Sequence, residues 1–366
     1  MRLVWYSEVK WNYLQTRKQN LLKYFPPEDK ILFFQPFSFV GSNYFLPRKD
    51  GNVYYLTLPT YRKSRFKLID RIVSVSFCRK LFYTILKGNA KLWIVLLFRK
   101  TPDRVCISNL FYLPLIKKTT IPVVWDFNDH PQQFGAQPNW ALKEFDLFLK
   151  DSRNSIISSS TGITEYINKK YNRIVTTIPN GVDLDYFNQK NTSGEVKQKL
   201  IIGYVGIISP WFFDFDLLRK ISENFTNCEI QLIGPCVNEV RDKLNNLIQN
   251  KNINYKGSKS YHLLPEIMKG FTVGIIPLYS IPEVWRLASG KFLQYLSAGI
   301  PVVSVWMDQF SKIEKNVYLS KSHNEFIDGL EKALKHSFIS MDDQLIEYDW
   351  KKLAKKFRNE LLAVNE

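Results

Sequence analysis

Residues 289–303 read SGKFLQYLSAGIPVV and give the clearest local indication of the fold. A glycine precedes Lys291, and the apolar residues that follow lie at helical spacing, so they share one face of a helix. Gly299 ends this helix just before Pro301 and a short apolar run. A helix that leads directly into a buried strand is the repeating unit of an α/β sheet.

The same stretch also suggests a binding site. A helix N-terminus beside Lys291 is a natural site for a diphosphate, because free N–H groups and an ammonium both face the anion. Taken alone, the stretch is equally consistent with a routine α/β unit that carries a surface lysine. The spacing by itself favours that simpler interpretation.

Apolar, β-branched runs recur along the whole chain with helical stretches between them. The runs occupy residues 2–7, 31–37, 53–58, 92–98, 105–108, 122–127, 155–158, 174–178, 200–205, 229–233, 253–256, 273–278, 301–305 and 316–319. Continuous rather than alternating apolar runs are typical of parallel strands that are covered on both faces. The chain is therefore predicted to be a doubly wound α/β protein.

A polar stretch at 188–199, NQKNTSGEVKQK, interrupts this pattern without apolar periodicity and is predicted to be an exposed linker. We therefore expect an N-terminal Rossmann-like lobe over residues 1–190 and a second one over 191–346. A C-terminal helix is expected over 347–366, because Trp350, Leu353, Phe357 and Leu361 recur at helical intervals.

Length and composition exclude several classes of protein. At 366 residues the chain is long enough for two cores. No window approaches the roughly 20 uncharged apolar residues of a membrane-spanning helix, and the best candidate, 92–98, has only the length of a strand. Four cysteines without CxxC spacing favour neither a disulfide framework nor a zinc site. We expect a protein of the reducing cytoplasm.

The net charge of +17 is concentrated in the first lobe. Residues 1–190 hold 29 Lys and Arg against 14 Asp and Glu, which gives +15, whereas the remainder holds 22 against 20, which gives +2. This asymmetry suggests an anionic partner for the first lobe, or a solvated basic face with no partner. Nucleic acid is not the expected partner, because no helix-turn-helix, RNA-recognition or zinc pattern accompanies the charge.

Residues 62–104 form the most basic segment, in which Lys and Arg alternate with apolar residues. Such a segment suits an interfacial helix that meets anionic lipids, with about 1 kcal/mol from each well-placed cation. It suits equally well an ordinary helix of an α/β lobe with a basic outer side. The sequence leaves both interpretations open.

Several segments resemble, in the same order along the chain, the motifs of glycosyltransferase family four and of related bacterial polysaccharide enzymes. They are SEVKWNYLQTRKQ at 7–19, WDFNDHPQQF at 125–134, IPNGVDLDYF at 178–187, YVGIISPWFFDFDLL at 204–218, QLIGP at 231–235, VGIIPL at 273–278 and KFLQYLSAGIPVVS at 291–304. The resemblance implies the GT-B fold, in which two Rossmann-like, doubly wound lobes face a central cleft. It also implies a C-terminal helix that crosses back to the N-terminal lobe.

For the second lobe the resemblance implies a nucleotide-sugar donor site. Lys291 matches the lysine that contacts the donor phosphates, and Gly203 and Gly206 match a turn that lets the backbone approach the diphosphate. The glutamate that binds the ribose in the family falls at Gln294, and the glutamate eight residues earlier falls at Arg286, so the E-x7-E pattern is absent. We expect Gln294 to bind the ribose more weakly than a carboxylate. Arg286 is a candidate to supply positive charge for the phosphates, although a surface arginine on a loop is the commoner explanation.

In the first lobe, Asp126 and Asp129 follow a predicted strand at its carboxyl end, where ligands of open α/β sheets bind. Asp129 is the first candidate for a catalytic base and Asp126 the second, although either is also a plausible turn residue. Trp11 and Arg17 lie where the family places its acceptor loop, and Arg17 is either a ligand for an acceptor phosphate or a plain surface residue. His130, before Pro131, is expected to be structural.

The resulting prediction is a cytoplasmic glycosyltransferase, peripheral to the inner face of the cell membrane, in bacterial surface polysaccharide synthesis. Its donor is a nucleoside-diphosphate sugar, with a UDP-sugar favoured, and its acceptor is a glycan or a lipid-linked glycan. No metal is expected, since Lys291, a helix dipole and backbone N–H groups compensate the leaving diphosphate. The alternatives are a non-catalytic scaffold of the same fold and, with less support, a nucleotide-sugar epimerase.

Overall fold

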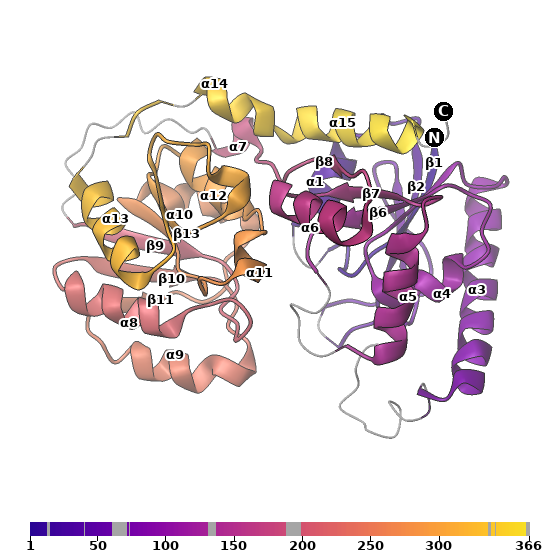
Figure 1. The fold of residues 1–366 in the computed structure, drawn as a ribbon, viewed down its shortest axis with the longest axis horizontal. Coiled ribbons are helices and arrows are strands. Elements are labelled where there is room, and N and C mark those ends of the chain that lie inside the picture. The colour runs from indigo at the N-terminus through magenta and orange to yellow at the C-terminus, as the bar shows by residue number, and fades with distance from the viewer. Residues whose placement is uncertain are drawn as a thin grey trace. The chain divides into compact units, whose positions relative to one another are not determined.

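The computed structural model describes residues 1–12, 15–39, 41–60, 72, 74–130, 137–187, 199–335, 338–340 and 342–363. The chain forms two compact units (Figure 1). Unit 1 consists of Met1–Ser159, Ile163–Ile178 and Ala354–Glu366, and unit 2 of Ser160–Gly162 and Pro179–Leu353. Each unit is built around its own sheet, as the doubly wound pattern predicts.

Unit 1 contains an eight-stranded sheet in the order β3-β4-β2-β1-β5-β6-β7-β8. Its strands are β1 (Arg2–Tyr6), β2 (Lys30–Gln35), β3 (Arg48–Asp50), β4 (Val53–Thr57), β5 (Arg104–Ile107), β6 (Val123–Phe127), β7 (Ser155–Ser158) and β8 (Thr176–Thr177). All neighbours are parallel except β3 and β4, which form an antiparallel edge. The carboxyl ends of the parallel strands therefore lie along one edge of the sheet.

Helices cover both faces of this sheet. They are α1 (Arg17–Lys23), α3 (Ser76–Phe98), α4 (Leu113–Ile116), α5 (Asn139–Lys150) and α6 (Thr161–Tyr171). Val4 and Tyr6 of β1 belong to a core cluster that includes residues of α3 to α6. Successive residues of a strand point to opposite faces, and Trp5 accordingly contacts the C-terminal helix on the other face, with its ring stacked on Phe357 at 5.6 Å. Unit 1 is thus doubly wound.

The C-terminal helix α15 (Trp350–Ala363) is confirmed, and the four residues predicted to face inward are all buried. Residues from Ala354 onward belong to unit 1, whereas Trp350–Leu353 belong to unit 2, so the helix returns to the first lobe as predicted. Arg358 donates to the carboxylate of the fully buried Asp29 at 2.6 and 3.0 Å. Arg104 donates to the carbonyl groups of Leu361 and Leu362 at the end of the helix.

Replacing Asp29 by asparagine should destabilise the protein by about 3 kcal/mol at neutral pH, because a buried ion pair is broken. Burial raises the pKa of Asp29, but hydrogen bonds from Arg358 and the Met1 amino group outweigh it and hold the pKa below 3.8. The stabilisation is therefore present above pH 3.8 and is lost as the pH falls through the lower, folded-state pKa. Urea unfolding of the wild-type and Asp29→Asn proteins, at neutral pH and at a pH below 3.8, measures how the difference in the free energy of unfolding changes with pH.

The exposed pair of Asp151 and Arg153 supplies the control. Asp151→Asn should change the free energy of unfolding by less than about 1 kcal/mol. An Asp29→Asn effect as small as that of the control would contradict a stabilising role for the Asp29–Arg358 pair between unit 1 and α15.

Unit 2 contains a six-stranded, all-parallel sheet in the order β11-β10-β9-β12-β13-β14. Its strands are β9 (Ile201–Val205), β10 (Glu229–Ile233), β11 (Ile253–Tyr255), β12 (Val273–Ile276), β13 (Val302–Val305) and β14 (Val317–Ser320). Its helices are α7 (Leu184–Phe187), α8 (Phe215–Asn224), α9 (Arg241–Leu247), α10 (Leu264–Lys269), α11 (Pro282–Trp285), α12 (Gly290–Ser297), α13 (His323–Lys335) and α14 (Asp342–Leu345). Every strand predicted for this lobe is present.

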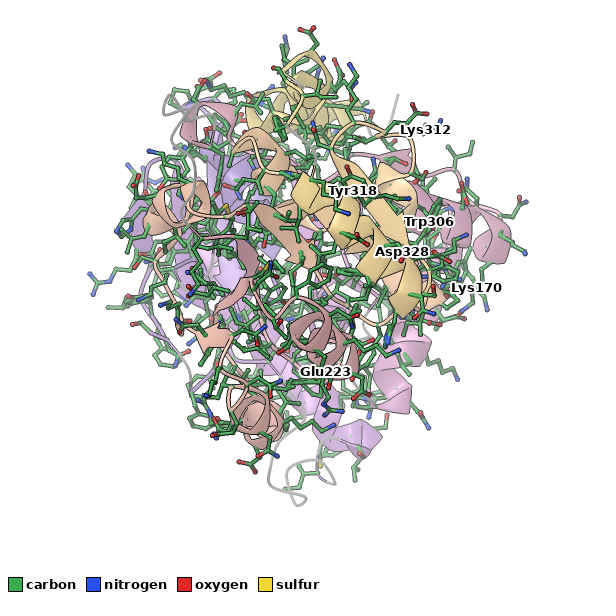
Figure 2. The ribbon with its side chains drawn as sticks, turned by 90° about the vertical axis from the view of Figure 1, so that its left-hand side faces the viewer. Lys170, Glu223, Trp306, Lys312, Tyr318 and Asp328 are labelled. Atoms are coloured by element: carbon green, nitrogen blue, oxygen red, sulfur yellow. The ribbon has the colours of Figure 1, made fainter. Side chains whose placement is uncertain are left out.

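Helices α12 and α13 pack on opposite faces of this sheet. A Cβ atom on Gly329 of α13 would lie 3.1 Å from Tyr318 and 3.6 Å from Val303, whereas one on Gly274 would lie 2.5 Å from the ring of Tyr295 in α12. Val303 pairs with Ile275, the residue after Gly274, and so points to the other face. Figure 2 looks onto the side of unit 2 that carries α13, with Asp328 of that helix and Tyr318 of β14 labelled.

One predicted strand is wrong. Residues 92–98 form the last turns of α3, not a strand. Buried residues of this helix, Tyr83, Leu86 and Ala90, recur at spacings of three and four, and the run at 92–98 continues the same helix. Because every residue of the run is apolar, the run itself shows neither helical nor strand periodicity. The helical spacing that decides its structure is found in the residues before it.

The two units divide between Ile178 and Pro179, earlier than the boundary predicted at residue 190. The difference arises because Val182 and Phe187 are buried in the core of unit 2. Residues 188–198 of the predicted linker lie outside the described residues, so that linker stays a prediction.

Candidate functional site

The N-terminus of helix α12 carries the features expected of an anion site. The side chain of the N-cap residue Ser289 forms no capping hydrogen bond. It therefore does not compete with a ligand for the first backbone N–H groups of the helix. Lys291, in the first turn, is half-buried and has no hydrogen bond or ion pair within the described part of the chain. Burial lowers its pKa to about 8. An anion at this position would restore the favourable environment that the ammonium lacks.

Tyr295 fixes the position of α12 on the sheet. Its hydroxyl accepts a hydrogen bond of 2.7 Å from the backbone N–H of Val205, the last residue of β9. Lys291 and Tyr295 are four residues apart and therefore lie on the same side of the helix. Lys291 is thus held on the side of α12 that faces the carboxyl end of β9 and the turn that follows it.

Gly203 does not lie in that turn, and its predicted place there is wrong. It lies within β9, paired with Gly274 of β12. A Cβ atom on Gly203 would lie 2.1 Å from the ring of Phe271, so the glycine is needed for packing. Together, Gly203 and Gly274 form a smooth patch of sheet that lets Phe271 and Tyr295 approach closely.

Gly206 does lie in the turn after β9. A Cβ atom there would lie 2.5 Å from the Tyr204 hydroxyl, and its N–H donates to the carbonyl of Ile233 at 2.9 Å. Gly234 has φ +137°, and a Cβ atom on it would lie 1.9 Å from the Gly206 carbonyl oxygen. Two glycine turns therefore pack against each other at the carboxyl ends of β9 and β10, and substitution at Gly234 would displace the Gly206 turn.

Gln294 lies three residues after Lys291, on the same side of α12. Its side chain is 6% exposed, and its amide oxygen Oε1 is buried without a hydrogen-bond partner in the described structure. A buried acceptor of this kind costs free energy until a donor reaches it. A ligand hydroxyl is a suitable donor, which supports the predicted ribose contact.

The loop before α12 is held from the segments that join the two units. The amide of Asn180, in the IPNGVD motif, donates to the carbonyl of Ala288 at 2.8 Å. The hydroxyl of Ser160 donates to the carbonyl of Arg286. A Cβ atom on Gly162 would lie 2.8 Å from the Arg286 Cα. Half-buried Arg286 therefore has a fixed backbone five residues before Lys291, and its predicted role at the phosphates stays a prediction.

The N-terminus of α8, the first helix after β9, is already occupied. Asp214 accepts hydrogen bonds from the N–H groups of Asp216 and Leu217 at 3.1 and 2.9 Å, and its second oxygen lies 2.8 Å from His323 Nε2. A carboxylate at this place repels a phosphate. The α12 terminus is accordingly the better anion site in unit 2.

In unit 1, Arg17 and Asp126 form a buried ion pair. Arg17 Nε donates to Asp126 Oδ1 at 2.9 Å, and the two side chains are 2% and 0% exposed. Asp126 also lies 3.9 Å from Lys18 Nζ. The structure corrects two predictions here, because neither Arg17 as an acceptor-phosphate ligand nor Asp126 as a base is accessible. The pair joins α1 to the end of β6.

Removal of the carboxylate with Asp126→Ala should destabilise the protein by about 3–5 kcal/mol, because a charged guanidinium stays buried beside the lost partner. The double variant Arg17→Met with Asp126→Leu should recover most of this loss. Denaturant unfolding of the three proteins measures the difference. An Asp126→Ala cost below about 1 kcal/mol would contradict the structural role.

Asp129 is the carboxylate whose environment suits a base. It follows β6, is half-buried and accepts a hydrogen bond from the Asn128 amide. Burial raises its pKa to about 6, although Lys18 opposes the shift. Lys18 itself is paired with Glu8. A carboxylate with a pKa near 6 accepts a proton more readily at neutral pH than an ordinary aspartate does.

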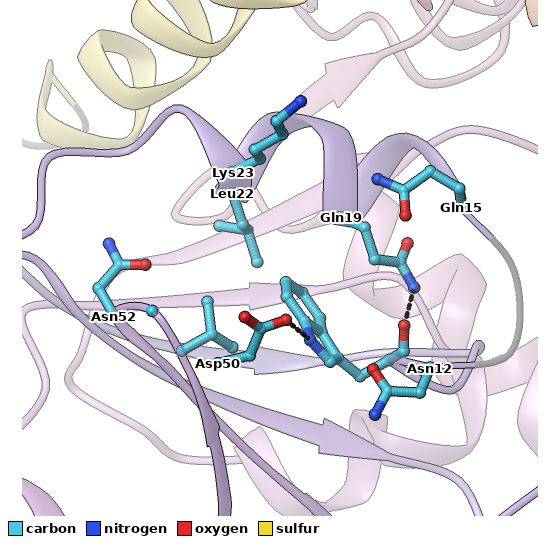
Figure 3. A pocket seen from close by; sticks show the side chains of 10 residues that line it. Asn12, Gln15, Gln19, Leu22, Lys23, Asp50 and Asn52 are labelled. Carbon is cyan, nitrogen blue, oxygen red and sulfur yellow. Dashed lines mark hydrogen bonds between the residues drawn. The ribbon is translucent and has the colours of Figure 1, made fainter. Parts of the chain in front are cut away.

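Trp11 lies elsewhere in unit 1. Its indole N–H donates to Asp50 at 2.9 Å, and the ring lines a cavity of about 270 Å³ beside α1 and the β3–β4 turn (Figure 3). That turn leads into the amino end of β4, which is the edge of the parallel sheet opposite to Asp129. The Trp11 ring therefore faces this cavity and Asp50, and its predicted role in acceptor binding stays a prediction.

His130 packs against aromatic rings, with ring centroids 5.9 Å from Phe127 and 5.8 Å from both Phe145 and Tyr166. This packing is consistent with its predicted structural role. The described residues contain no group of three or more His, Cys, Asp or Glu that could hold a metal ion. The prediction that no metal is needed remains a prediction.

Comparison with known proteins places this architecture among the two-lobed GT-B proteins. No family model matches the chain. Sucrose-phosphate synthase from Thermosynechococcus elongatus superposes with a TM-score of 0.69 at 11% identity, over 98% of this chain and 94% of that one. HepE from Anabaena, solved with UDP and glucose, gives 0.68 at 13% identity over 99% and 100%. The predicted GT-B fold is confirmed; at such identities the likeness establishes the fold alone.

Among curated proteins, the chain is similar to TuaH of Bacillus subtilis (strain 168), which is assigned as a glycosyltransferase of teichuronic acid biosynthesis. The identity is 23% over 205 residues, which is 53% of this chain. The match spans about half the length of TuaH, or 51%. The resemblance to bacterial polysaccharide glycosyltransferases predicted from the sequence motifs is therefore found independently.

Proposed function

We propose that the protein is a glycosyltransferase that moves a sugar from a UDP-sugar to a glycan or a lipid-linked glycan in the synthesis of a bacterial surface polysaccharide. The observation that carries the proposal is the α12 terminus, where half-buried Lys291 has a lowered pKa and Gln294 holds an unsatisfied acceptor. A diphosphate and a ribose satisfy these two groups together. The similarities to TuaH and HepE support the same class of reaction.

In this proposal unit 2 holds the donor. Lys291, the first amides of α12 and the Gly206 turn receive the diphosphate, and they stabilise its charge as the bond to the sugar breaks. Arg286, in the loop before α12, adds positive charge near the diphosphate, and Gln294 binds the ribose. These groups supply the charge compensation for the leaving nucleotide.

Unit 1 presents the acceptor, and Asp129 takes the proton of the attacking hydroxyl. The acceptor is proposed to be a glycan or a lipid-linked glycan, used in the cytoplasm at the inner face of the cell membrane. The pKa of about 6 leaves Asp129 mostly ionised at neutral pH and still basic enough to accept a proton.

The experiment is a panel of UDP-, GDP-, dTDP- and ADP-sugars incubated with the purified full chain, with nucleotide release followed with and without lipid-linked and oligosaccharide acceptors. We expect release from one donor, favouring a UDP-sugar, that increases when the acceptor is added. A protein that releases no nucleotide from any donor, and whose melting temperature no donor raises, would instead have to be a non-catalytic member of the fold.

A further inference from the structure

Helix α3 (Ser76–Phe98) has two apolar faces, and unit 1 covers one of them. The covered face includes Tyr83, Leu86 and Ala90, and the Tyr83 hydroxyl donates to the Phe111 carbonyl at 2.7 Å. The helix lies on the outside of unit 1, with no helix or strand drawn beyond it (Figure 1). By length and composition alone it is the one described helix that could cross a membrane, contrary to the prediction that the best candidate, 92–98, has only the length of a strand.

The opposite face of α3 is apolar and exposed to solvent. Its side chains are 53–74% exposed and we call them the outer stripe: Phe77, Leu81, Ile85, Leu92 and Leu96. Their spacings of four, four, seven and four residues place them along one line of the helix. At about 100° per residue, this line points away from the buried face. An apolar line of this length on an isolated chain indicates a binding surface.

A row of lysines runs beside the outer stripe. Lys80, Lys87 and Lys91 are exposed and spaced by seven and four residues, so they form a second line on one flank of the helix. Arg99 and Lys100 follow at its end, and the helix contains no acidic residue. The first half of the chain, with its charge of +15 over residues 1–190, adds a long-range attraction for anions.

We propose that the outer stripe and its lysine row dock unit 1 on the surface of an anionic lipid bilayer, with α3 lying in the plane of the interface. The aliphatic and aromatic side chains enter the boundary of the acyl chains, and the lysines reach the phosphate groups of the lipids. This inference does not rest on the proposed transfer reaction. Of the two interpretations of the basic segment, an interfacial helix and an ordinary helix with a basic outer side, the exposed apolar line of α3 favours the interfacial helix.

Two other arrangements fit the contacts less well. A helix that spanned the bilayer would have to leave the core of unit 1, which would expose Tyr83, Leu86 and Ala90 and break the Tyr83 hydrogen bond. In a symmetric dimer through the same face, the lysine row of one chain would lie near the lysine row of the other chain. The negative charge of anionic lipid headgroups attracts the lysine row, whereas the lysine row of a second chain would repel it.

The test is flotation of the full chain with vesicles of phosphatidylcholine alone or with about one third phosphatidylglycerol. We expect binding to the anionic vesicles that is weakened by salt, and little binding to the neutral ones. Ile85→Asn with Leu92→Asn should weaken binding by about tenfold or more. Lys80→Gln, Lys87→Gln and Lys91→Gln together should weaken it by about 100-fold on anionic vesicles only.

A matched control removes two exposed apolar residues of unit 1 that lie off α3, with Leu147→Asn and Ile174→Asn. This control should bind within about twofold of the wild-type chain. The proposal is overturned by an absence of flotation, by an equal loss in the control, by retention of the protein after a high-salt and alkaline wash, or by a lipid-free dimer that the outer-stripe variant abolishes. Binding of UDP to the same variants should be unchanged, so this test is separate from that of the transferase.

Discussion

Replacing Lys291 by alanine should weaken UDP binding by about 10- to 100-fold and lower turnover at saturating donor by about 100-fold or more. Lys291 is half-buried at an uncapped helix terminus without a partner among the described residues, so the diphosphate is the group that its charge is placed to meet. The effect on turnover is the larger because negative charge grows on the leaving phosphate as the sugar bond breaks. Calorimetric titration with UDP and a nucleotide-release assay measure the two quantities.

The pH dependence of the same binding gives a sharper result. The pKa of Lys291 is lowered to about 8, so the ammonium is present below pH 8 and is lost as the pH rises above it. UDP affinity should therefore be steady from about pH 6.5 to 7.5 and fall between about pH 8 and 10. Bound diphosphate favours the charged form of the lysine and so raises its pKa in the complex; the fall in affinity therefore begins near the pKa of the free protein and levels off above the pKa of the complex.

Two substitutions control this experiment. Lys291→Arg keeps the charge and should retain part of the affinity, with no fall between pH 8 and 10. Lys269→Ala removes a lysine of unit 2 whose ion pair with Glu266 is on the surface, and UDP binding should not change. If Lys291→Ala bound UDP as tightly as Lys269→Ala does, the α12 terminus would not be the diphosphate site.

Replacing Asp129 by asparagine should lower turnover by about 10²- to 10⁴-fold and leave UDP affinity within about twofold. The amide keeps the shape of the side chain and loses the ability to accept a proton. Because burial raises the pKa of Asp129 to about 6, the wild-type rate should rise with pH between 5 and 7 as the carboxylate ionises. Rates across this range, with donor affinity measured in parallel, test the assignment.

The control is Asp146→Asn, an aspartate of unit 1 that pairs with Lys150 on the surface. It should leave both turnover and its pH profile unchanged. A catalytic role for Asp129 would be ruled out by an Asp129→Asn variant that turns over at the wild-type rate, and such a result would direct the search for a base to other groups.

Local patterns in the sequence predicted much of the fold. The runs at 200–205, 229–233 and 301–305 are strands, and each is a short apolar segment marked at one end by a turn residue, namely Gly206, Gly234 and Pro301. The spacing of Trp350, Leu353, Phe357 and Leu361 likewise predicted α15 correctly. In all of these elements the signal and the structure lie within the same few residues.

The errors arose where distant residues decide the structure. Arg17 and Asp126 are 109 positions apart, and no spacing in the sequence indicates that they neutralise each other. The hydrogen bond from Val205 to Tyr295, which positions Lys291, spans 90 positions. Gly203 was predicted to lie in a turn because Gly206, three residues later, does lie in one, but Phe271 packs on Gly203 inside the strand. Contacts of this kind need the folded coordinates.

The most direct test of the account is a crystal structure of the protein soaked with UDP. We predict that the diphosphate lies at the N-terminus of α12, roughly 3 Å from Lys291 Nζ, with a ribose hydroxyl donating to Gln294 Oε1. UDP bound at another place in unit 2, or no bound UDP at a saturating concentration, would contradict the central claim that α12 forms the donor site.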